Sequence, residues 1–144
     1  MIYYTADPHL GHDNIRKLCD RPFATIEEMD ETIINNWNSK VTDKDDVYIL
    51  GDFSFKAKDP TEYLKRLKGK KHLIVGNHDS KLLRHPDLHK YLVEVVNMKT
   101  IIDNGTRIVL CHYPLVEWDG YYKNTLHFYG HVHNSYHNET TRYA

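Results

Sequence analysis

Residues that can bind metal ions follow short apolar runs at five places along this chain. Each apolar run is typical of a buried strand, and carboxylate, imidazole or amide side chains come directly after it. These residues are Asp7 and His9, then Asp52, then Asn77, His78 and Asp79, then His112, and finally His131 and His133. Carboxylates and imidazoles suit manganese, iron, zinc, nickel or cobalt, and an amide oxygen is a neutral donor. The pattern predicts a site for divalent cations, provided that the five segments converge.

The spacing inside the segments suits shared ligation. Asp7 and His9 are two residues apart, as are His131 and His133, and residues at that spacing on extended backbone point to the same side. An aspartate such as Asp52 has two oxygens and can bridge two cations. Glycine precedes three of the segments and lets the backbone turn sharply and approach closely. These glycines are Gly51, Gly76 and Gly130.

Each segment has an ordinary explanation when it is taken alone. Asp7-Pro8 is typical of a turn, and Asn77 to Asp79 after a glycine is common turn chemistry. His131 and His133 could be solvent-facing residues of an alternating strand. All five segments together, in this order and each at a predicted strand end, favour the metal site over five unrelated turns.

Strands alternate with helices in the first half of the chain. Apolar runs predict strands at residues 2–5, 47–50, 72–75 and 126–129. Thr25 has the capping-box spacing to Glu28, and apolar residues recur at helical intervals from there to Trp37. A second helix is expected to open at Asp59-Pro60 and to end at Gly69.

The second half of the chain predicts a broken helix and a hairpin. Residues 80–92 read as helical, with a break before Pro86. Asn104-Gly105 lies between extended runs at 93–102 and 107–111, a strong signal for a two-residue hairpin. The order of elements predicts an α/β domain with a mixed sheet, in which ligands gather outside the carboxyl ends of the strands.

Composition is consistent with one globular domain over residues 1–144, because 40% of them are hydrophobic and 27% charged. The net charge of −1 argues against nucleic-acid binding by bulk charge and leaves room for a local basic groove. We expect a cytoplasmic protein, because there is no apolar run of membrane-spanning length and no leader-like start. Cys19 and Cys111 read as two reduced thiols.

Taken in order, the motifs Asp-x-His, Gly-Asp, Gly-Asn-His-Asp, a single His and Gly-His-x-His resemble the signature of the calcineurin-like metallophosphoesterases. The resemblance covers the chain from Asp7 to His133. The segment 9–15 and Arg21-Pro22-Phe23 are similar, more narrowly, to a group of small bacterial and phage phosphoesterases.

This resemblance implies a fold and a ligand set. The fold would be a four-layer αββα sandwich with mixed sheets, and the centre would hold two divalent ions. Manganese is the first choice, with iron, nickel, zinc, cobalt or magnesium as the others. One ion would be held by Asp7, His9 and His133, the other by Asn77, His112 and His131, with Asp52 bridging them.

It also implies an activity, the hydrolysis of phosphate esters by a hydroxide that two metal ions activate. His78 would lie near the leaving group, so His78 and the bridging Asp52 are the expected catalytic residues. Arg21, Asn77 and His78 are the expected substrate-binding residues. The expected substrates are small phosphodiesters or phosphomonoesters, nucleotides included.

Two departures from the family pattern stand out. Many relatives have a second aspartate a few residues after Gly-Asp, where this chain continues Asp52-Phe53-Ser54-Phe55-Lys56, so the orienting partner of His78 is open. The chain also ends eleven residues after His133, where related chains commonly add a strand.

Several alternatives remain open from the sequence. A metal-dependent nuclease would use the same chemistry, and a metal-stabilised binding module without activity is a third possibility. His12 could support a metal ligand or lie exposed, whereas His72, His85, His89, His127 and His137 are not expected to be ligands. The aromatic loop after His112 could stack a nucleobase, but a small satellite core is the preferred interpretation. The oligomeric state is left open.

Overall fold

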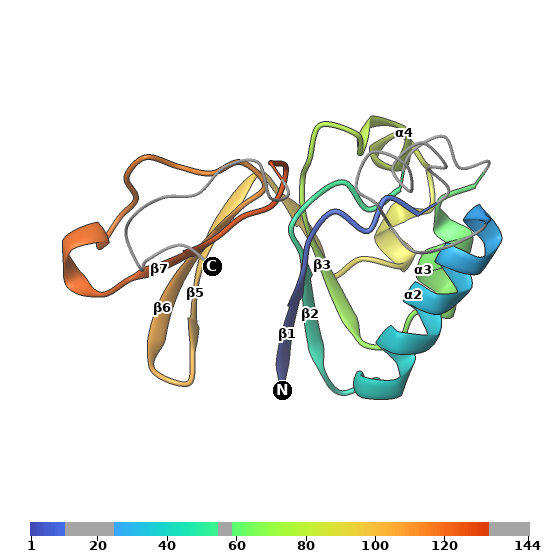
Figure 1. The fold of residues 1–144 in the computed structure, drawn as a ribbon, viewed down its shortest axis with the longest axis horizontal. Coiled ribbons are helices and arrows are strands. Elements are labelled where there is room, and N and C mark those ends of the chain that lie inside the picture. The colour runs from blue at the N-terminus through green and yellow to red at the C-terminus, as the bar shows by residue number, and fades with distance from the viewer. Residues whose placement is uncertain (11–24, 55–58, 133–144) are drawn as a thin grey trace.

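Seven strands form two sheets in the computed structural model, which describes residues 1–10, 25–54 and 59–132 (Figure 1). The first sheet has the order β1-β2-β3-β4, and all its pairs are parallel. Its strands are β1 (Ile2–Thr5), β2 (Asp46–Ile49), β3 (Lys70–Ile74) and β4 (Glu94–Val96). In the second sheet β5 is antiparallel to β6, and β6 is parallel to β7. Its strands are β5 (Met98–Asp103), β6 (Thr106–Cys111) and β7 (Leu126–Phe128).

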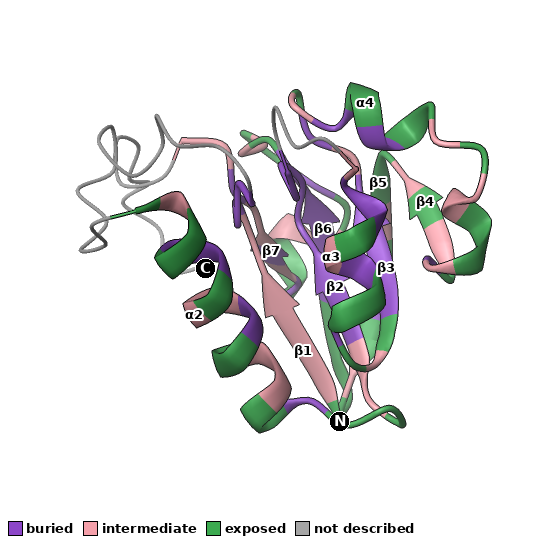
Figure 2. Ribbon diagram, turned by 90° about the vertical axis from the view of Figure 1, so that its right-hand side faces the viewer, coloured by how far each residue is buried: buried purple, intermediate pink, exposed green. Residues whose placement is uncertain are grey.

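Helices pack on the outer face of the first sheet. They are α2 (Ile26–Lys40), α3 (Thr61–Arg66) and the short α4 (Ser80–Leu83), followed by the 3-10 turn η1 (Leu88–Lys90). The predicted start of α2 is confirmed, because the Thr25 hydroxyl accepts a hydrogen bond from the Glu28 amide at 3.1 Å. Its buried residues face the sheet, as the purple stretches of α2 in Figure 2 show.

Two apolar cores hold the layers together. The first includes Ile34 of α2, Leu64 of α3 and Leu73 of β3, and so joins the helices to the first sheet. The second includes Ile74 of β3 and Leu110 of β6, and lies between the two sheets. Burial of these apolar faces is the main driving force for the arrangement. The predicted metallophosphoesterase sandwich of two packed sheets is thereby confirmed. Of the four layers of the predicted αββα order, the described residues form the two sheets and the helical layer on the first sheet, and the second sheet is partly covered by the loop after β6.

The loop after β6 covers part of the outer face of the second sheet. It contains the 3-10 turn η2 (Tyr121–Lys123). The Trp118 side chain is buried, and its ring centroid lies 5.0 Å from that of His127 on β7. The indole N–H donates to the Thr125 carbonyl at 2.9 Å. This packing matches the satellite core expected for the aromatic loop.

Two predicted segments differ in detail from the structure. Residues 80–92 form only α4 and η1, because Pro86 has no backbone N–H and disfavours helical backbone at His85. The extended run at 93–102 is two strands, since β4 pairs with β3 in the first sheet and β5 pairs with β6 in the second. The chain therefore changes sheets at Asn97, between these two strands.

The predicted hairpin turn is confirmed. Asp103 pairs with Thr106, and the two residues between them both have positive φ, 50° at Asn104 and 84° at Gly105. This is the type I′ combination, whose twist matches that of the flanking strands.

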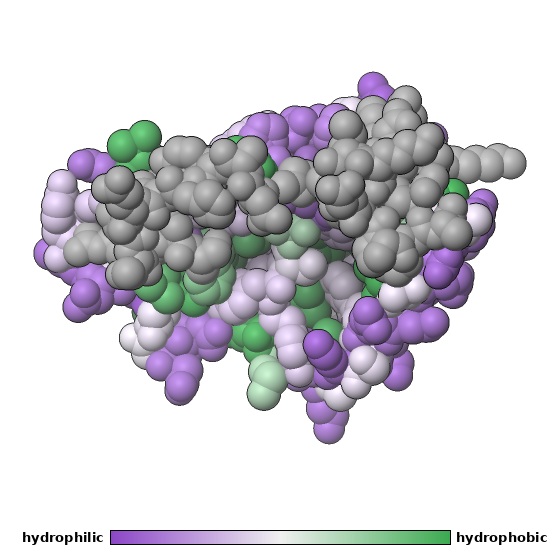
Figure 3. All heavy atoms as spheres, viewed as in Figure 1, coloured by the Kyte–Doolittle hydropathy of each residue, from purple (hydrophilic) through white to green (hydrophobic). Residues whose placement is uncertain are grey.

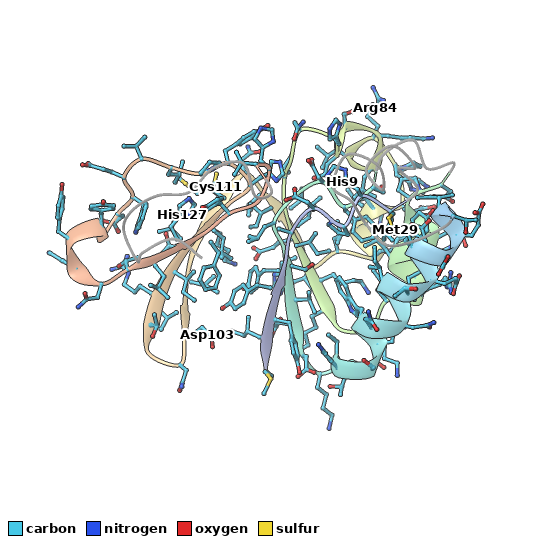
Figure 4. The ribbon with its side chains drawn as sticks, in the orientation of Figure 1. His9, Met29, Arg84, Asp103, Cys111 and His127 are labelled. Carbon is cyan, nitrogen blue, oxygen red and sulfur yellow. The ribbon has the colours of Figure 1, made fainter. Side chains whose placement is uncertain are left out.

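The strands that carry the metal-binding motifs end on the same side of the molecule. Thr5, Ile49 and Leu73 lie side by side in register, so β1, β2 and β3 end together. Backbone hydrogen bonding between the segments after β1 and β2 continues past these ends. The His9 amide donates to the Asp52 carbonyl at 3.0 Å. In Figure 4 His9 lies at this end of the first sheet, and Asp103 lies toward the opposite end of the second.

An apolar cavity of about 240 Å³ lies between the edges of the two sheets. It is lined by Tyr4, Leu50 and Phe128, among others. In the space-filling view of Figure 3, which has the orientation of Figure 1, hydrophobic residues reach the surface in the middle of the molecule, between more hydrophilic flanks. Among the described residues, no helix has the length and apolar character that crossing a membrane requires.

Candidate metal centre

The strand ends bring two groups of possible metal ligands together. Ligand atoms of Asp7, His9 and Asp52 all lie within 4.8 Å of one another. The same holds for Asp52, His112 and His131. Asp52 belongs to both groups, as a carboxylate between two cations must. All of these ligands except His131 are buried, so most of the ligand atoms are shielded from solvent at the ends of the strands.

Asn77 lies at the middle of the second group. One terminal atom of its amide is 3.0 Å from Nε2 of His112 and 3.2 Å from Nδ1 of His131. The same atom is 3.0 Å and 3.2 Å from the two carboxylate oxygens of Asp52. With nitrogen at this place the amide donates to its neighbours, and with oxygen there several lone pairs converge. Converging lone pairs are the arrangement that a cation requires.

His112 has the hydrogen bonding of a metal ligand. Its Nδ1–H donates to the carbonyl of Leu50 at 2.8 Å, which leaves the lone pair on Nε2. That Nε2 is 3.3 Å from Oδ2 of Asp52. A backbone carbonyl that holds one imidazole nitrogen, so that the other can bind metal, is the usual outer support of such sites.

The charges at the centre also suit a cation. Burial disfavours a charged carboxylate, but hydrogen bonds from His112 and the His78 amide hold the pKa of Asp52 below its usual value. Burial likewise disfavours a protonated imidazole, but the hydrogen bonds to Asp52 and Leu50 and the charge of Asp7 raise the pKa of His112. A metal ion among the same carboxylates would take the place of that proton.

Strained backbone is concentrated at the candidate ligands. Among the described residues other than glycine, six have positive φ, and two of these are asparagines in turns. The other four are Asp7 (52°), His9 (50°), Asp52 (53°) and His131 (67°). Such backbone costs free energy and persists where the surrounding structure enforces it, most often at functional sites. The sharp turns direct four side chains, from the ends of β1, β2 and β7, toward the candidate centre.

Three glycines make room for these ligands. A Cβ at Gly76 would lie 2.5 Å from Oδ1 of Asp52, and one at Gly130 would lie 2.8 Å from Oδ2 of Asp7. A Cβ at Gly51 would overlap the imidazole of His112. Each glycine therefore accommodates a ligand from a different segment of the chain, which goes beyond the local turn expected from the sequence.

Asp79 connects two of the ligand-bearing turns. Its carboxylate accepts hydrogen bonds from the backbone amides of Asp52 (2.9 Å), Phe53 (2.9 Å) and Gly76 (2.7 Å). Asp79 is fully buried, and burial raises the pKa of its carboxyl group. The sequence left open whether this residue orients His78, and the structure directs its carboxylate to these backbone amides instead.

His78 lies at the edge of the centre. Its backbone amide donates to Oδ1 of Asp52 at 2.8 Å. Its ring centroid is 5.6 Å from that of His9, in an edge-to-face arrangement. The side chain is only partly buried, so it adjoins both the ligands and the solvent.

Tyr113 is a neighbour of the centre that sequence reasoning missed. Its ring centroid lies 4.8 Å from that of His131 and 4.9 Å from that of His112. It is 43% exposed and therefore forms part of the rim. The signal available in the sequence was the position of Tyr113 directly after His112. It was grouped there with the other residues of the aromatic loop and not assigned to the centre.

Other histidines have partners away from the centre. His72 lies between Asp46 and Glu94, at 2.9 Å and 2.8 Å, and His127 bonds to backbone groups of the second sheet. His85 approaches Asp59 at 3.4 Å. The predictions for Arg21, His12, Cys19, His133 and His137 fall outside the described residues, whereas Cys111 is a buried free thiol.

Comparison with known proteins gives a family match over almost the whole chain. A sequence model described as calcineurin-like phosphoesterase matches residues 1–139. An uncharacterized protein of Methanocaldococcus jannaschii is 51% identical over 81 residues, which cover 54% of this chain and 46% of that protein. The Gene 66 protein of Mycobacterium phage L5 is 32% identical over 135 residues, which cover 79% of this chain and 63% of that protein. The chain thus spans about half to two thirds of the length of these curated relatives.

Two solved structures are similar in fold. A protein of unknown function from Aquifex aeolicus superposes with a TM-score of 0.73 and 30% identity, over 96% of this chain and 81% of that one. A Vps29 from Entamoeba histolytica, solved in complex with Zn²⁺, gives a TM-score of 0.51 at 14% identity. That match covers 97% of this chain and 68% of the other, and at such identity it shows the fold alone.

Proposed function

Because this chain belongs to the calcineurin-like phosphoesterase family, we propose that it is a metal-dependent hydrolase of phosphate esters. Its substrates would be small phosphodiesters or phosphomonoesters, nucleotides among them. The observation that carries the proposal is the carboxylate of Asp52, which belongs to both groups of candidate ligands. A dinuclear centre needs one shared ligand of this kind, whereas a structural site for a single ion does not.

Two divalent cations would fit the residues at this centre. Asp7 and His9 with Asp52 would hold one ion, and Asn77, His112 and His131 with Asp52 would hold the other. His133 is proposed as a further ligand of the first ion from the sequence alone. Manganese is our first choice, with iron, nickel, zinc, cobalt or magnesium as alternatives, because all the donors are oxygen or nitrogen. The Zn²⁺ in the Vps29 structure supports testing zinc as well.

When bound, such ions supply an ionised water near neutral pH and a positive environment for the phosphate. Asp7 and Asp52 are the only carboxylates in the proposed set, so a loaded centre would keep a net positive charge and attract the anionic substrate. Asn77 adds a donor without adding charge.

The chain's own residues would orient the ester and handle the proton. The His78 amide donates a hydrogen bond of 2.8 Å to Asp52, and the partly buried imidazole lies at the edge of the centre. We assign to that imidazole the donation of a proton or hydrogen bond to the leaving oxygen. Asn77, His78 and Arg21 are the proposed substrate contacts, of which Arg21 rests on the sequence alone.

The test is a matrix of metals and substrates. Purified protein is stripped with chelator, reloaded with manganese, nickel, iron, magnesium or zinc, and assayed on phosphomonoesters, phosphodiesters, cyclic nucleotides and single-stranded DNA. We expect metal-dependent turnover of small esters and none in the Asp52→Asn variant prepared in parallel, which controls for contaminating phosphatases. Cleavage of DNA alone would indicate a nuclease. Metal binding without turnover of any substrate would indicate a non-catalytic module.

A further inference from the structure

A cleft separate from the candidate metal centre lies at the opposite end of the first sheet. Its volume is about 690 Å³, and its lining residues come mainly from α3, the start of β3 and the segment from η1 to β4. The polar and aromatic residues that line it include Lys65, Lys70, Lys71, His89, Lys90 and Tyr91. β3 begins in this cleft, and the turn with Asn77 follows its other end, about 16 Å away at ~3.3 Å per residue.

Basic residues are concentrated here although the whole chain is nearly neutral. Residues 65–71 contain five of the 19 lysines and arginines and no carboxylate, and three of the five, Lys65, Lys70 and Lys71, line the cleft. Arg66 is outside this lining and pairs with Glu31 at 2.7 Å. Lys90 and His89 add to this set from the opposite wall, and Asp43 is the acidic residue that lines the cleft. A local basic groove of this kind is the feature that the net charge of −1 left possible.

Lys71 is a buried cation at this cleft. Only 8% of the residue is exposed, and its Nζ donates to the carbonyl of Leu67 at 2.5 Å. That bond closes the C-terminal end of α3, but a carbonyl does not neutralise an ammonium group. The charge of Asp43, which lines the same cleft, acts on Lys71, but the two form no ion pair within 4 Å in the described part of the chain. Burying a charge without a close counter-ion is unfavourable, so an anion in the cleft would stabilise Lys71 further.

The lysines on the walls are available to a ligand. Lys65 pairs with Glu62 at 2.9 Å and Lys90 with Asp87 at 3.2 Å, and all four side chains are about half exposed. Surface pairs of this kind contribute little and exchange readily. Lys70 has no ion pair within the described part of the chain. The Lys65 ammonium also lies 5.6 Å from the ring centroid of Tyr91.

We propose that this cleft binds the backbone phosphates of a single-stranded nucleic acid. Lys65, Lys70 and Lys90 would contact phosphates, with the buried Lys71 adding fixed positive charge. The volume exceeds what one phosphate fills, and lysines on both walls suit a chain of phosphates. Tyr91 offers an aromatic surface for a base, the combination found where proteins bind single strands.

This site is separate from the candidate metal centre, so binding is tested without catalysis. Anisotropy of a fluorescein-labelled short oligothymidylate is measured with the full chain in chelator, over a series of salt concentrations. We expect binding that weakens as salt rises. Lys70→Gln and Lys90→Gln should each reduce the slope of log affinity against log salt by about 0.7, the value for one phosphate contact on a single strand.

Lys123→Gln is the matched control, because Lys123 is an exposed lysine on η2, in the loop between β6 and β7. It should leave the slope unchanged, and thermal melting should show that all variants are folded. Lys71 is kept intact, because its contact with Leu67 also supports α3. No binding at low salt, or equal slopes for Lys70→Gln and Lys123→Gln, would overturn the proposal. If inorganic tripolyphosphate at the same phosphate concentration displaces the oligothymidylate, the ligand of the cleft is a small polyphosphate and the proposal of a nucleic acid is overturned.

Discussion

The carboxylate of Asp79 accepts a hydrogen bond from the backbone amide of Asp52 at 2.9 Å, across 27 residues of sequence. Asp79 follows β3, and Asp52 follows β2, so one buried side chain joins the turns after two neighbouring strands. The same carboxylate accepts from Gly76, which precedes Asn77. The geometry of the candidate centre therefore depends on a residue that is not itself among the candidate ligands.

Replacing Asp79 by asparagine should loosen both turns. The amide has one oxygen in place of two, and its NH₂ group would face a backbone donor that the carboxylate now satisfies. We expect a loss of about 1–3 kcal/mol in the free energy of unfolding, the usual penalty for a buried polar group without its partner. We also expect weaker manganese or zinc binding by calorimetry, because Asp52 and Asn77 would lose their fixed positions.

Asp87→Asn is the matched control for this change. Asp87 pairs with Lys90 at 3.2 Å on the surface, so its replacement should change the free energy of unfolding by less than about 0.5 kcal/mol. Equal stability and equal metal affinity in Asp79→Asn and Asp87→Asn would show that Asp79 does not hold the turns.

Gly51→Ala should disturb the centre more than Gly105→Ala. Both glycines have a left-handed backbone, with φ of 83° and 84°, so both alanine variants carry a similar backbone strain of about 1–2 kcal/mol. At Gly105 the added Cβ meets nothing within 4 Å, whereas at Gly51 it would lie 2.6 Å from Cγ of His112. Denaturant unfolding should show the larger loss for Gly51→Ala, and metal analysis should show reduced metal content in that variant alone. Similar losses and full metal content in both variants would contradict this account.

Asp52→Asn should reduce metal content more than Asp7→Asn. Asp52 is common to both groups of candidate ligands, and Asp7 belongs to one. Loss of the shared carboxylate removes an anionic ligand from both ions, while loss of Asp7 weakens one. Elemental analysis of protein dialysed against limiting manganese should therefore rank the wild type first, Asp7→Asn second and Asp52→Asn last. Wild-type metal content in Asp52→Asn would exclude a bridging role.

The convergence of the ligand-bearing segments is largely predictable from the sequence, because parallel strands are easy to recognise and their ends lie together. Buried strands read as apolar runs, and the carboxyl ends of neighbouring parallel strands lie at one edge. The apolar runs that precede Asp7, Asp52 and Asn77 are therefore enough to predict that these three residues lie together. Asn104-Gly105 is equally local, since both residues adopt the positive φ that the turn needs.

The features that were missed depend on contacts between distant residues. The sequence at 93–102 reads as one extended run, because apolar periodicity reports burial and not which sheet a strand joins. The change of sheet at Asn97 is therefore not visible in the sequence. The Leu50 carbonyl that fixes the tautomer of His112 is 62 residues away, and any residue type could supply it. Asp79 looked like ordinary turn chemistry because its partners are backbone amides, which leave no mark in the sequence.

His127 should make the protein less stable in mild acid. Burial lowers the pKa of its imidazole, against hydrogen bonds that raise it. The neutral ring is held by Nδ1–H donating to the Val109 carbonyl and Nε2 accepting from the Leu115 amide, both at 3.0 Å. The folded state thus binds fewer protons than the unfolded one, and stability falls as the pH drops below the unfolded pKa of ~6.5.

His127→Gln removes this linkage and isolates it from the other histidines. We measure the free energy of unfolding of both proteins in chelator at pH 7.5 and pH 5.5. The wild type should be the more stable at the higher pH, and its advantage should shrink at the lower pH by at most ~1.4 kcal/mol per unit below the unfolded pKa. An advantage that stays the same at both pH values would mean that His127 does not titrate differently in the folded state.

His78→Ala should lower turnover while both metal ions stay bound, if the proposed hydrolase activity holds. The contact of His78 with Asp52 runs through its backbone amide, which alanine retains, so the position of Asp52 should be preserved. Loss of a general acid typically lowers the rate by ~10²–10⁴-fold. The loss should be smaller for nitrophenyl esters than for alkyl esters with poor leaving groups, because nitrophenolate leaves without needing a proton.

His85→Ala is the matched control, since His85 lies against Asp59 and outside both ligand groups, and it should keep wild-type rates. Reduced metal content in His78→Ala would make His78 a ligand. An equal rate loss for good and poor leaving groups would make it a positioning residue and not the proton donor.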